Sequence, residues 1–183
     1  GDFLEHRRVL ERIGVTVSEV RLPKHLEDVD GLIIPGGEST TIAQLMDIYD
    51  LARPLVKRAK AGMPLWGTCA GMIVISTRLR DHRPVPLGLI DIEVARNAFG
   101  RQVDSFETGL YFKGIDGPPY HAVFIRAPVV TNVGHGVRVL AYLADGRPVA
   151  VQKDNIIATS FHPELTDDTR IHEFFVNIVR DVA

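Results

Sequence analysis

The chain has 183 residues, a formal net charge of −2, 45% apolar residues and 24% charged residues. These values are ordinary for a globular protein with a sizeable core, exclude no common enzyme class, and give no reason to expect binding to nucleic acid or to a membrane surface. No apolar run approaches the roughly 20 residues that cross a bilayer, and the single cysteine, Cys69, excludes an internal disulfide and suggests a reducing, cytoplasmic compartment.

The first half of the sequence predicts helices that alternate with short apolar strands. Gly14 and Gly62 mark helix ends, and Ser39, Thr40 and Thr41 offer N-caps. The expected helices cover 2–13, 42–49 and 51–61, and the expected strands cover 15–20, 29–34 and 63–66. Such alternation is typical of a parallel sheet that is covered by helices on both faces.

The second half predicts strands that are separated by turns such as Asp145-Gly146, which is typical of hairpins. The expected strands cover 90–94, 106–112, 123–125, 137–142, 148–152 and 156–160. A last helix, over 168–182, has apolar residues at helical spacing that indicate core packing. We therefore expect one α/β domain over 1–183, with three layers, an open and mostly parallel sheet, and an antiparallel portion in the second half.

Cys69 lies in a Gly-x-Cys-x-Gly segment, 67–71, between a buried strand and an apolar run. This context is typical of a nucleophile elbow, a strained turn that exposes the nucleophile at the carboxyl end of a strand. A helix N-terminus at this point favours the thiolate. The alternative is a glycine-rich turn with a buried, inert cysteine.

His162 and Glu164 follow the last predicted strand, and residues two apart in extended chain point the same way. The carboxylate can then orient the imidazole, and Cys69 with this pair would form the Cys-His-acid arrangement that activates a thiol for acyl transfer. A solvated histidine beside a surface acid is the alternative. We expect no metal site, because the three residues lack a fourth ligand and His-x-Glu is not a typical zinc spacing, and we expect no cofactor.

A glycine-rich segment, 35–39, lies between a predicted strand and a predicted helix. Backbone N–H groups of Gly37 and Ala70 are candidates for an oxyanion hole, and Glu38 for contact with a substrate ammonium. A plain turn capped by Ser39 is the alternative. A phosphate loop is disfavoured, because no Gly-Lys-Ser/Thr follows and Glu38 would repel phosphate.

Two segments, 96–102 and 124–128, place arginines near aromatic residues. Because arginine binds carboxylates through two hydrogen bonds, Arg96 or Arg126 could meet a substrate carboxylate or a partner surface. Composition alone favours ordinary surface salt bridges. The other histidines receive no role, and solvent or partner contact is the expectation for His6 on the first helix.

Taken together, these segments resemble the class I (triad-type) glutamine amidotransferases, which have a flavodoxin-like fold. They resemble most the family of glutaminase subunits of pyridoxal 5′-phosphate synthases. The matching segments run in the family's order across nearly the whole chain: Pro35-Gly36-Gly37-Glu38-Ser39-Thr40-Thr41, Gly67-Thr68-Cys69-Ala70-Gly71, 96–107, Phe124-Ile125-Arg126-Ala127-Pro128 and Ser160-Phe161-His162-Pro163-Glu164-Leu165-Thr166. The segment 96–107 is the one that points to the vitamin B6 branch.

The resemblance implies a reaction, a site and a partner. It implies hydrolysis of L-glutamine to glutamate and ammonia, with Cys69 as nucleophile and His162 and Glu164 completing the triad. It implies glutamine contacts at Gly37, Glu38, Ser39, Arg96, Ile125 and Arg126. It also implies a separate synthase partner, in a ring-shaped oligomeric core, that receives the ammonia.

One departure from the family lies at the start of the chain. The family begins with an apolar strand that ends in Ala-Leu-Gln before the Gly-Asp found here at 1–2, and α/β sheets usually open with a strand. We therefore expect a native first strand ahead of Gly1.

Three other functions remain open. One is a glutaminase that feeds a different biosynthetic synthase. Another is an intracellular peptidase or deglycase on a similar fold, disfavoured because those enzymes usually place histidine directly after the cysteine, where this chain has Ala70. The third is a non-catalytic regulatory or scaffolding protein, disfavoured because Cys69, His162 and Glu164 are all present.

Overall fold

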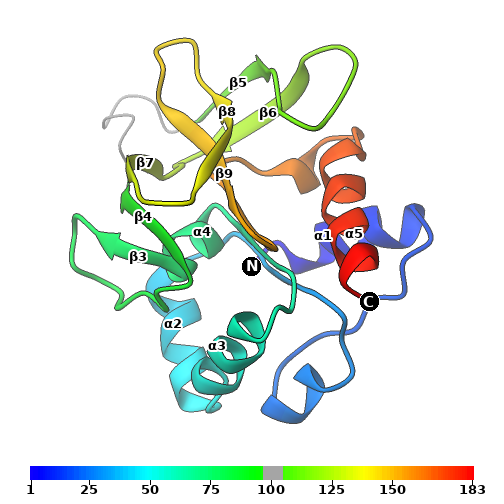
Figure 1. Ribbon diagram of the computed structural model, residues 1–183, viewed down its shortest axis with the longest axis vertical. Coiled ribbons are helices and arrows are strands. Elements are labelled where there is room, and N and C mark those ends of the chain that lie inside the picture. The colour runs from blue at the N-terminus through cyan, green and yellow to red at the C-terminus, as the bar shows by residue number, and fades with distance from the viewer. Residues whose placement is uncertain (97–104) are drawn as a thin grey trace.

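A twisted sheet runs through the middle of the computed structural model, which describes residues 1–96 and 105–183 (Figure 1). Within these residues the sheet has five strands in the order β1-β2-β10-β9-β8. Strands β1, β2 and β10 are parallel, whereas β9 is antiparallel to both β10 and β8. Their bounds are Leu32–Ile34 (β1), Leu65–Thr68 (β2), Arg138–Tyr142 (β8), Pro148–Lys153 (β9) and Ile156–Thr159 (β10).

The two faces of this sheet bury two separate apolar clusters. On β2, Leu65 belongs to the cluster that contains Met72 of α4 and Leu55 of α3, whereas its neighbour Trp66 belongs to the cluster that contains Phe175 of α5. The alternation follows from the strand, because successive side chains point to opposite faces. The helices are α1 (Phe3–Arg12), α2 (Ser39–Ile48), α3 (Ala52–Lys60), α4 (Ala70–Ile75) and α5 (Arg170–Val182).

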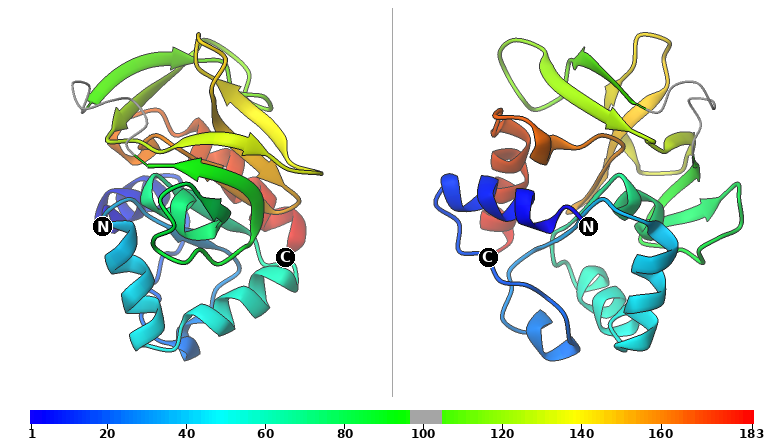
Figure 2. Two further views of the ribbon diagram at one scale, coloured as in Figure 1. Left: turned by 90° about the vertical axis from the view of Figure 1, so that its left-hand side faces the viewer. Right: turned by 180° about the vertical axis from the view of Figure 1, so that it is seen from behind.

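Helices therefore cover both faces of the sheet, which confirms the predicted three-layer α/β arrangement with an antiparallel portion. Helices α2, α3 and α4 lie on one side and helices α1 and α5 lie side by side on the other, as the views of Figures 1 and 2 agree. Smaller elements complete the description: η1 (Pro23–Leu26), β3 (Ser76–Leu79), β4 (Ile90–Ala95), β5 (Ser105–Leu110), β6 (Tyr120–Ile125), β7 (Val129–Val133) and η2 (Pro163–Leu165). Strands β3, β4 and β7 form one further sheet, and β5 and β6 another.

Most predicted elements are present, with ends that shift by a few residues. The strand predicted over 15–20 is wrong: the segment alternates in burial, as an extended chain does, but no described strand pairs with it. Strands β3 and β7 were not predicted. The predicted capping of α2 is also wrong, because the carboxylate of Glu38, not a hydroxyl, accepts from the N–H groups of Thr40 and Thr41.

In the described part of the chain, no helix has both the length and the apolar character needed to span a membrane. The final helix shows why: α5 has 13 residues, and its apolar side chains Ile171 and Phe175 pack into the protein core. The apolar stripe predicted on this helix is thus core packing.

Two glycines allow β2 and α4 to meet at a sharp angle. A Cβ atom on Gly71 would lie 2.0 Å from the carbonyl oxygen of Ile34, and one on Gly67 would lie 2.6 Å from the backbone of Gly71. Both obstacles are backbone atoms, which cannot move aside like a flexible side chain. The close approach of α4 to β1 therefore requires glycine at position 71, and its close approach to β2 requires glycine at position 67.

We expect Gly71→Ala to lower the free energy of unfolding by about 3 kcal/mol or more, because the added methyl overlaps Ile34 in a packed core. Urea denaturation measures the change. Gly109→Ala is the matched control, since its Cβ would meet only the side chain of Pro119, at 3.1 Å, on an exposed strand. Equal stability losses in the two variants would contradict the packing argument.

Candidate active site

Cys69 occupies the single-residue link between β2, which ends at Thr68, and α4, which begins at Ala70. Its φ of 50° and ψ of −105° are unusual for a residue with a side chain, and such a backbone costs about 1–3 kcal/mol. The peptide is held in place by the Cys69 N–H, which donates to the carbonyl of Thr159 at 2.8 Å. The link therefore has the geometry of a nucleophile elbow, as the sequence predicts.

His162 and Glu164 follow β10, the strand next to β2, and so lie at the same edge of the sheet as Cys69. Nδ1 of His162 is 2.7 Å from Oε1 of Glu164, and both side chains are almost completely buried. The backbone N–H of His162 donates to the carbonyl of Val123 at 2.8 Å, which joins this segment to β6. The contact with Glu164 leaves the other ring nitrogen of His162 for the thiol.

The electrostatics of the three side chains favour a charged imidazole. Burial alone would lower the pKa of His162, but hydrogen bonds and charge interactions with Cys69 and Glu164 outweigh it and raise that pKa to about 10. Burial raises the pKa of Glu164, while its hydrogen bond to His162 opposes that rise. A thiol, an imidazole and a carboxylate in this order can activate the sulfur for acyl transfer.

A second carboxylate also approaches His162. Oδ2 of Asp2 lies 3.4 Å from Nδ1 of His162, and the Asp2 N–H donates to the carbonyl of Gly36 at 3.4 Å. A Cβ atom on Gly36 would lie 2.6 Å from the imidazole ring, so the glycine-rich segment packs directly against the histidine. Neither the Asp2 contact nor the Gly36 contact was predicted from the sequence. The available signal was that Gly36 directly precedes Gly37, the expected oxyanion residue.

The two acids and His162 also form the candidate metal-binding group among the described residues. Asp2, His162 and Glu164 offer ligand atoms within 4.8 Å of one another. The distance between His162 Nδ1 and Glu164 Oε1 is that of a hydrogen bond, so a proton rather than a metal ion lies between these two atoms. Cys69 is not part of the group. The geometry therefore fits a hydrogen-bonded pair better than a metal centre.

Glu38, directly before α2, and Arg96, directly after β4, lie close to each other. Hydrogen bonds from the backbone N–H groups of Thr40 and Thr41 lower the pKa of Glu38 to about 2, so the carboxylate is ionised at neutral pH. One guanidinium nitrogen of Arg96 is 3.9 Å from Glu38 Oε1. The structure thus brings these two predicted contacts together, and the same carboxylate also caps α2.

The other predicted contacts lie near the sulfur or beside Glu38. The carbonyl of Ile125 is 3.9 Å from Cys69 Sγ, and Arg126 follows it with a positive φ of 44°. Ala70 is the first residue of α4. Gly37 and Ser39 flank Glu38, with Ser39 buried. Most of the family-like segment 96–107, namely residues 97–104, lies outside the described residues.

Two buried histidines were not predicted from the sequence. His6, expected to contact solvent or a partner, is only 3% exposed, and His172 on α5 is fully buried. Each was recognisable as inward-facing from its helix: His6 is three residues from Val9, and His172 is three residues from Phe175, both apolar and buried. Nothing in the sequence indicated that the two rings meet.

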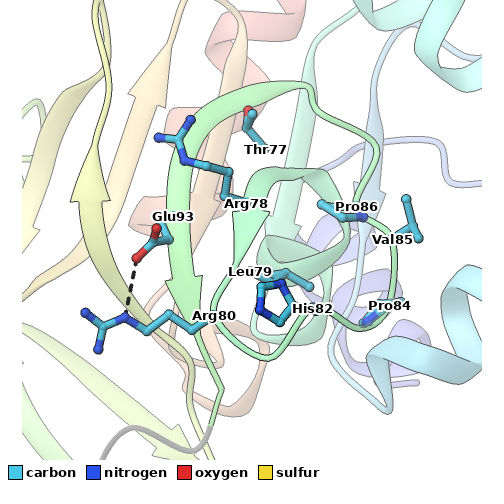
Figure 3. A pocket seen from close by; sticks show the side chains of 9 residues that line it. All are labelled: Thr77, Arg78, Leu79, Arg80, His82, Pro84, Val85, Pro86 and Glu93. Carbon is cyan, nitrogen blue, oxygen red and sulfur yellow. Dashed lines mark hydrogen bonds and ion pairs between the residues drawn. The ribbon is translucent and has the colours of Figure 1, made fainter.

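A surface pocket lies elsewhere, between β3, β4 and the loop that joins them (Figure 3). Its lining residues are Thr77, Arg78, Leu79, Arg80, His82, Pro84, Val85, Pro86 and Glu93. None of these is a predicted site residue, and Arg80 is paired with Glu93 at 3.4 Å. The pocket therefore contains none of the residues predicted for catalysis or substrate binding.

Comparison with known proteins gives relatives along the whole chain. A protein of Herpetosiphon aurantiacus, named pyridoxal 5′-phosphate synthase subunit PdxT, is 52% identical over 97% of this chain and 95% of its own. The protein of the same name from a Parafrankia species is 54% identical over 98% of this chain and 89% of its own.

Solved structures agree with the sequence relatives. A structure described as a glutamine amidotransferase superimposes with a TM-score of 0.93, at 46% identity and over 98% of this chain and 95% of that one. The structure of PurLQS from Thermotoga maritima, at 18% identity and a TM-score of 0.69 over 97% of this chain and 92% of that one, shares the fold alone. The model of the SNO glutamine amidotransferase family matches residues 1–181. The chain therefore belongs to the SNO glutamine amidotransferase family.

Proposed function

We propose that this chain hydrolyses L-glutamine to glutamate and ammonia at Cys69, His162 and Glu164, and passes the ammonia to a separate synthase partner that makes pyridoxal 5′-phosphate. The observation on which the proposal rests is the elbow at Cys69, at the same edge of the sheet as a buried His162 whose Nδ1 lies 2.7 Å from Oε1 of Glu164. Relatives at 52–54% identity that are named as subunits of this synthase support the choice of partner.

In the first half of the reaction, the Cys69 thiolate attacks the carbon of the glutamine side-chain amide. The N–H of Ala70 is available to the oxyanion because the first N–H groups of a helix lack partners within the helix. Gly37, on the glycine-rich segment, supplies the second donor, and such a donor typically contributes about 3 kcal/mol. Protonated His162 gives its proton to the departing nitrogen, so ammonia leaves and a glutamyl thioester remains.

In the second half, neutral His162 takes a proton from water, and the resulting hydroxide attacks the thioester. Glutamate leaves, the thiolate returns, and the imidazole is protonated again. Glu164 stays hydrogen-bonded to Nδ1 of His162 throughout. It therefore keeps the other ring nitrogen directed at the reacting atoms and stabilises the imidazolium.

The substrate's other groups meet the residues around the elbow. Arg96 and Arg126 are suited to the α-carboxylate of glutamine, and the ionised Glu38 is suited to its ammonium. The backbone of Ile125 lies beside the sulfur, at 3.9 Å, and we assign Gly37 and Ser39, which flank Glu38, to the same substrate. The synthase partner, which we expect to form a ring-shaped oligomeric core, receives the ammonia as it leaves.

We expect the synthase core to stimulate glutamate release from glutamine strongly, and Cys69→Ala to abolish release in both conditions, because no other thiol is present. A coupled glutamate assay with and without the core measures both effects. Equal rates with and without the core would move the glutaminase to another biosynthetic synthase. Full activity of Cys69→Ala would contradict the proposed chemistry altogether.

Cys69→Ser should lose at least about two orders of magnitude in kcat, because a serine hydroxyl is far less ionised than a thiol at neutral pH. The substitution changes one atom, so the unfolding midpoint serves as the control for folding and should stay within a few degrees of the parent protein. Retention of most turnover would rule out a thiolate nucleophile.

The pKa of His162 should fall by at least about one pH unit in Cys69→Ala, because the thiol is a main source of its rise to about 10. In the parent protein, a raised histidine pKa adds stability that is complete below about pH 6.5 and disappears as pH rises through about 10. Titration of the His162 ring resonance by NMR, assigned with His162→Gln, tests the shift. An unchanged pKa would show that the sulfur does not contact the ring.

A further inference from the structure

Two buried histidines extend the row of side chains that begins at Cys69. Nε2 of His6, on α1, lies 3.2 Å from Thr68 Oγ1 and 3.3 Å from Glu164 Oε2. Nδ1 of His6 is 2.9 Å from Nε2 of His172, on α5. The row therefore runs from α5 through α1 to the carboxylate that contacts His162.

The row is closed off from water. The side chain of Glu164 is 0% exposed and that of His6 is 4% exposed. The ring of Trp66 packs edge-on against both histidines, with centroid distances of 5.7 Å to His6 and 5.0 Å to His172. Burial is the main cause that lowers the pKa of His6, and it also lowers the pKa of His172 to about 3, so both rings are neutral at physiological pH.

Two neutral rings can share one hydrogen bond in two ways, and the surroundings favour one of them. If His6 donated to His172, its Nε2 lone pair would face the carboxylate of Glu164. Nδ1 of His172 would then be a buried N–H, yet no hydrogen-bond partner for this atom exists in the described residues. Such an orphan donor costs about 1–3 kcal/mol.

The opposite arrangement removes both penalties. His172 donates from Nε2, the Nδ1 atom of His6 accepts, and the proton of His6 lies on Nε2, which is hydrogen-bonded to Thr68 Oγ1 at 3.2 Å and lies 3.3 Å from Glu164 Oε2. Within the described residues, Oε2 of Glu164 accepts no hydrogen bond, so the His6 Nε2–H at 3.3 Å is the polar group that can stabilise its charge from this side. The geometry thus selects the tautomer of His6 that presents a proton to the carboxylate.

We propose that His6 is a positioning residue for the reaction: its Nε2–H lies 3.3 Å from Oε2 of Glu164 and stabilises the carboxylate electrostatically, and His172 fixes the tautomer that places the proton there. The proposal rests on the proposed function, because His6 acts through Glu164 and does not touch the substrate. Oε1 binds His162 and Oε2 faces His6, so the carboxylate plane is held from both ends. The orientation of the imidazole then depends on a helix, α1, that contributes no group to the chemistry.

The effect on pH dependence follows from the charge of Glu164. Without the donor, the buried carboxylate is less stable, so its pKa rises further and it takes up a proton at a higher pH as the solution is acidified. Protonated Glu164 no longer stabilises the imidazolium. Among the described residues, the ionisable groups that also face this row, from the elements packed against it, are Asp2, Arg12, Cys69, Tyr120 and His162.

The test compares His6→Leu, which removes the donor, with His6→Gln, whose amide nitrogen can replace Nε2. His172→Leu is an independent variant on another helix. It leaves His6 in place but removes the hydrogen bond that determines which ring nitrogen of His6 carries the proton. Val9→Ala is the matched control, since Val9 is the other buried residue of α1 and its truncation weakens the packing of this helix without removing a side-chain hydrogen bond. Each is assayed for glutamine hydrolysis in the complex with the synthase core, as kcat and KM across pH, beside an unfolding curve.

We expect His6→Leu to lower kcat about tenfold with little change in KM. We also expect it to shift the acidic limb of the kcat–pH profile to higher pH by about one unit. His172→Leu should shift the limb in the same direction, His6→Gln should restore most of it, and Val9→Ala should lower stability alone. If the acidic limb of the kcat–pH profile is the same in His6→Leu as in the parent protein, or if His6→Leu loses stability alone as Val9→Ala does, the proposal is wrong. Activity that survives in Cys69→Ala would instead overturn the triad itself.

Discussion

The buried carboxylate of Glu164 is the constraint around which the rest of the site is arranged. Moving an ionised carboxylate out of water costs several kcal/mol unless hydrogen bonds and an opposite charge replace the lost hydration. His162 supplies the charge at Oε1, and His6 lies beside Oε2. These contacts join the segment after β10 to α1, and through His172 to α5, so one buried carboxyl group connects three parts of the chain that are distant in sequence.

Packing on the other face of the sheet fixes the backbone of Cys69 at the elbow. Cys69 is held in a costly backbone conformation because Gly67 and Gly71 let α4 approach β1 and β2 more closely than any side chain would permit. The packed core of α4 supplies the compensating stability, since all six of its residues are buried. The strained Cys69 and the buried Glu164 are thus each stabilised by packing that lies outside their own side chains.

Local patterns in the sequence predicted a large part of this architecture. Alternating helices and apolar strands indicated the layered α/β arrangement, and the glycines around Cys69 indicated the elbow. The strand expected over 15–20 failed because alternation predicts only an extended chain, whereas a strand also needs a neighbour to pair with. The cap of α2 was misassigned because a Glu38 side chain can reach the same N–H groups as a hydroxyl.

The sequence by itself determined which reactive groups are available: one thiol, a histidine and a carboxylate two residues apart, and the motifs that relate the chain to its family. Residue type and short-range spacing suffice for this, because they decide which groups are available. Only the tertiary structure decided that His6, Asp2 and His172 join the site, because contacts between α1, α5 and the end of β10 arise from packing across the sheet. No periodicity along one helix specifies which buried ring it will meet on another.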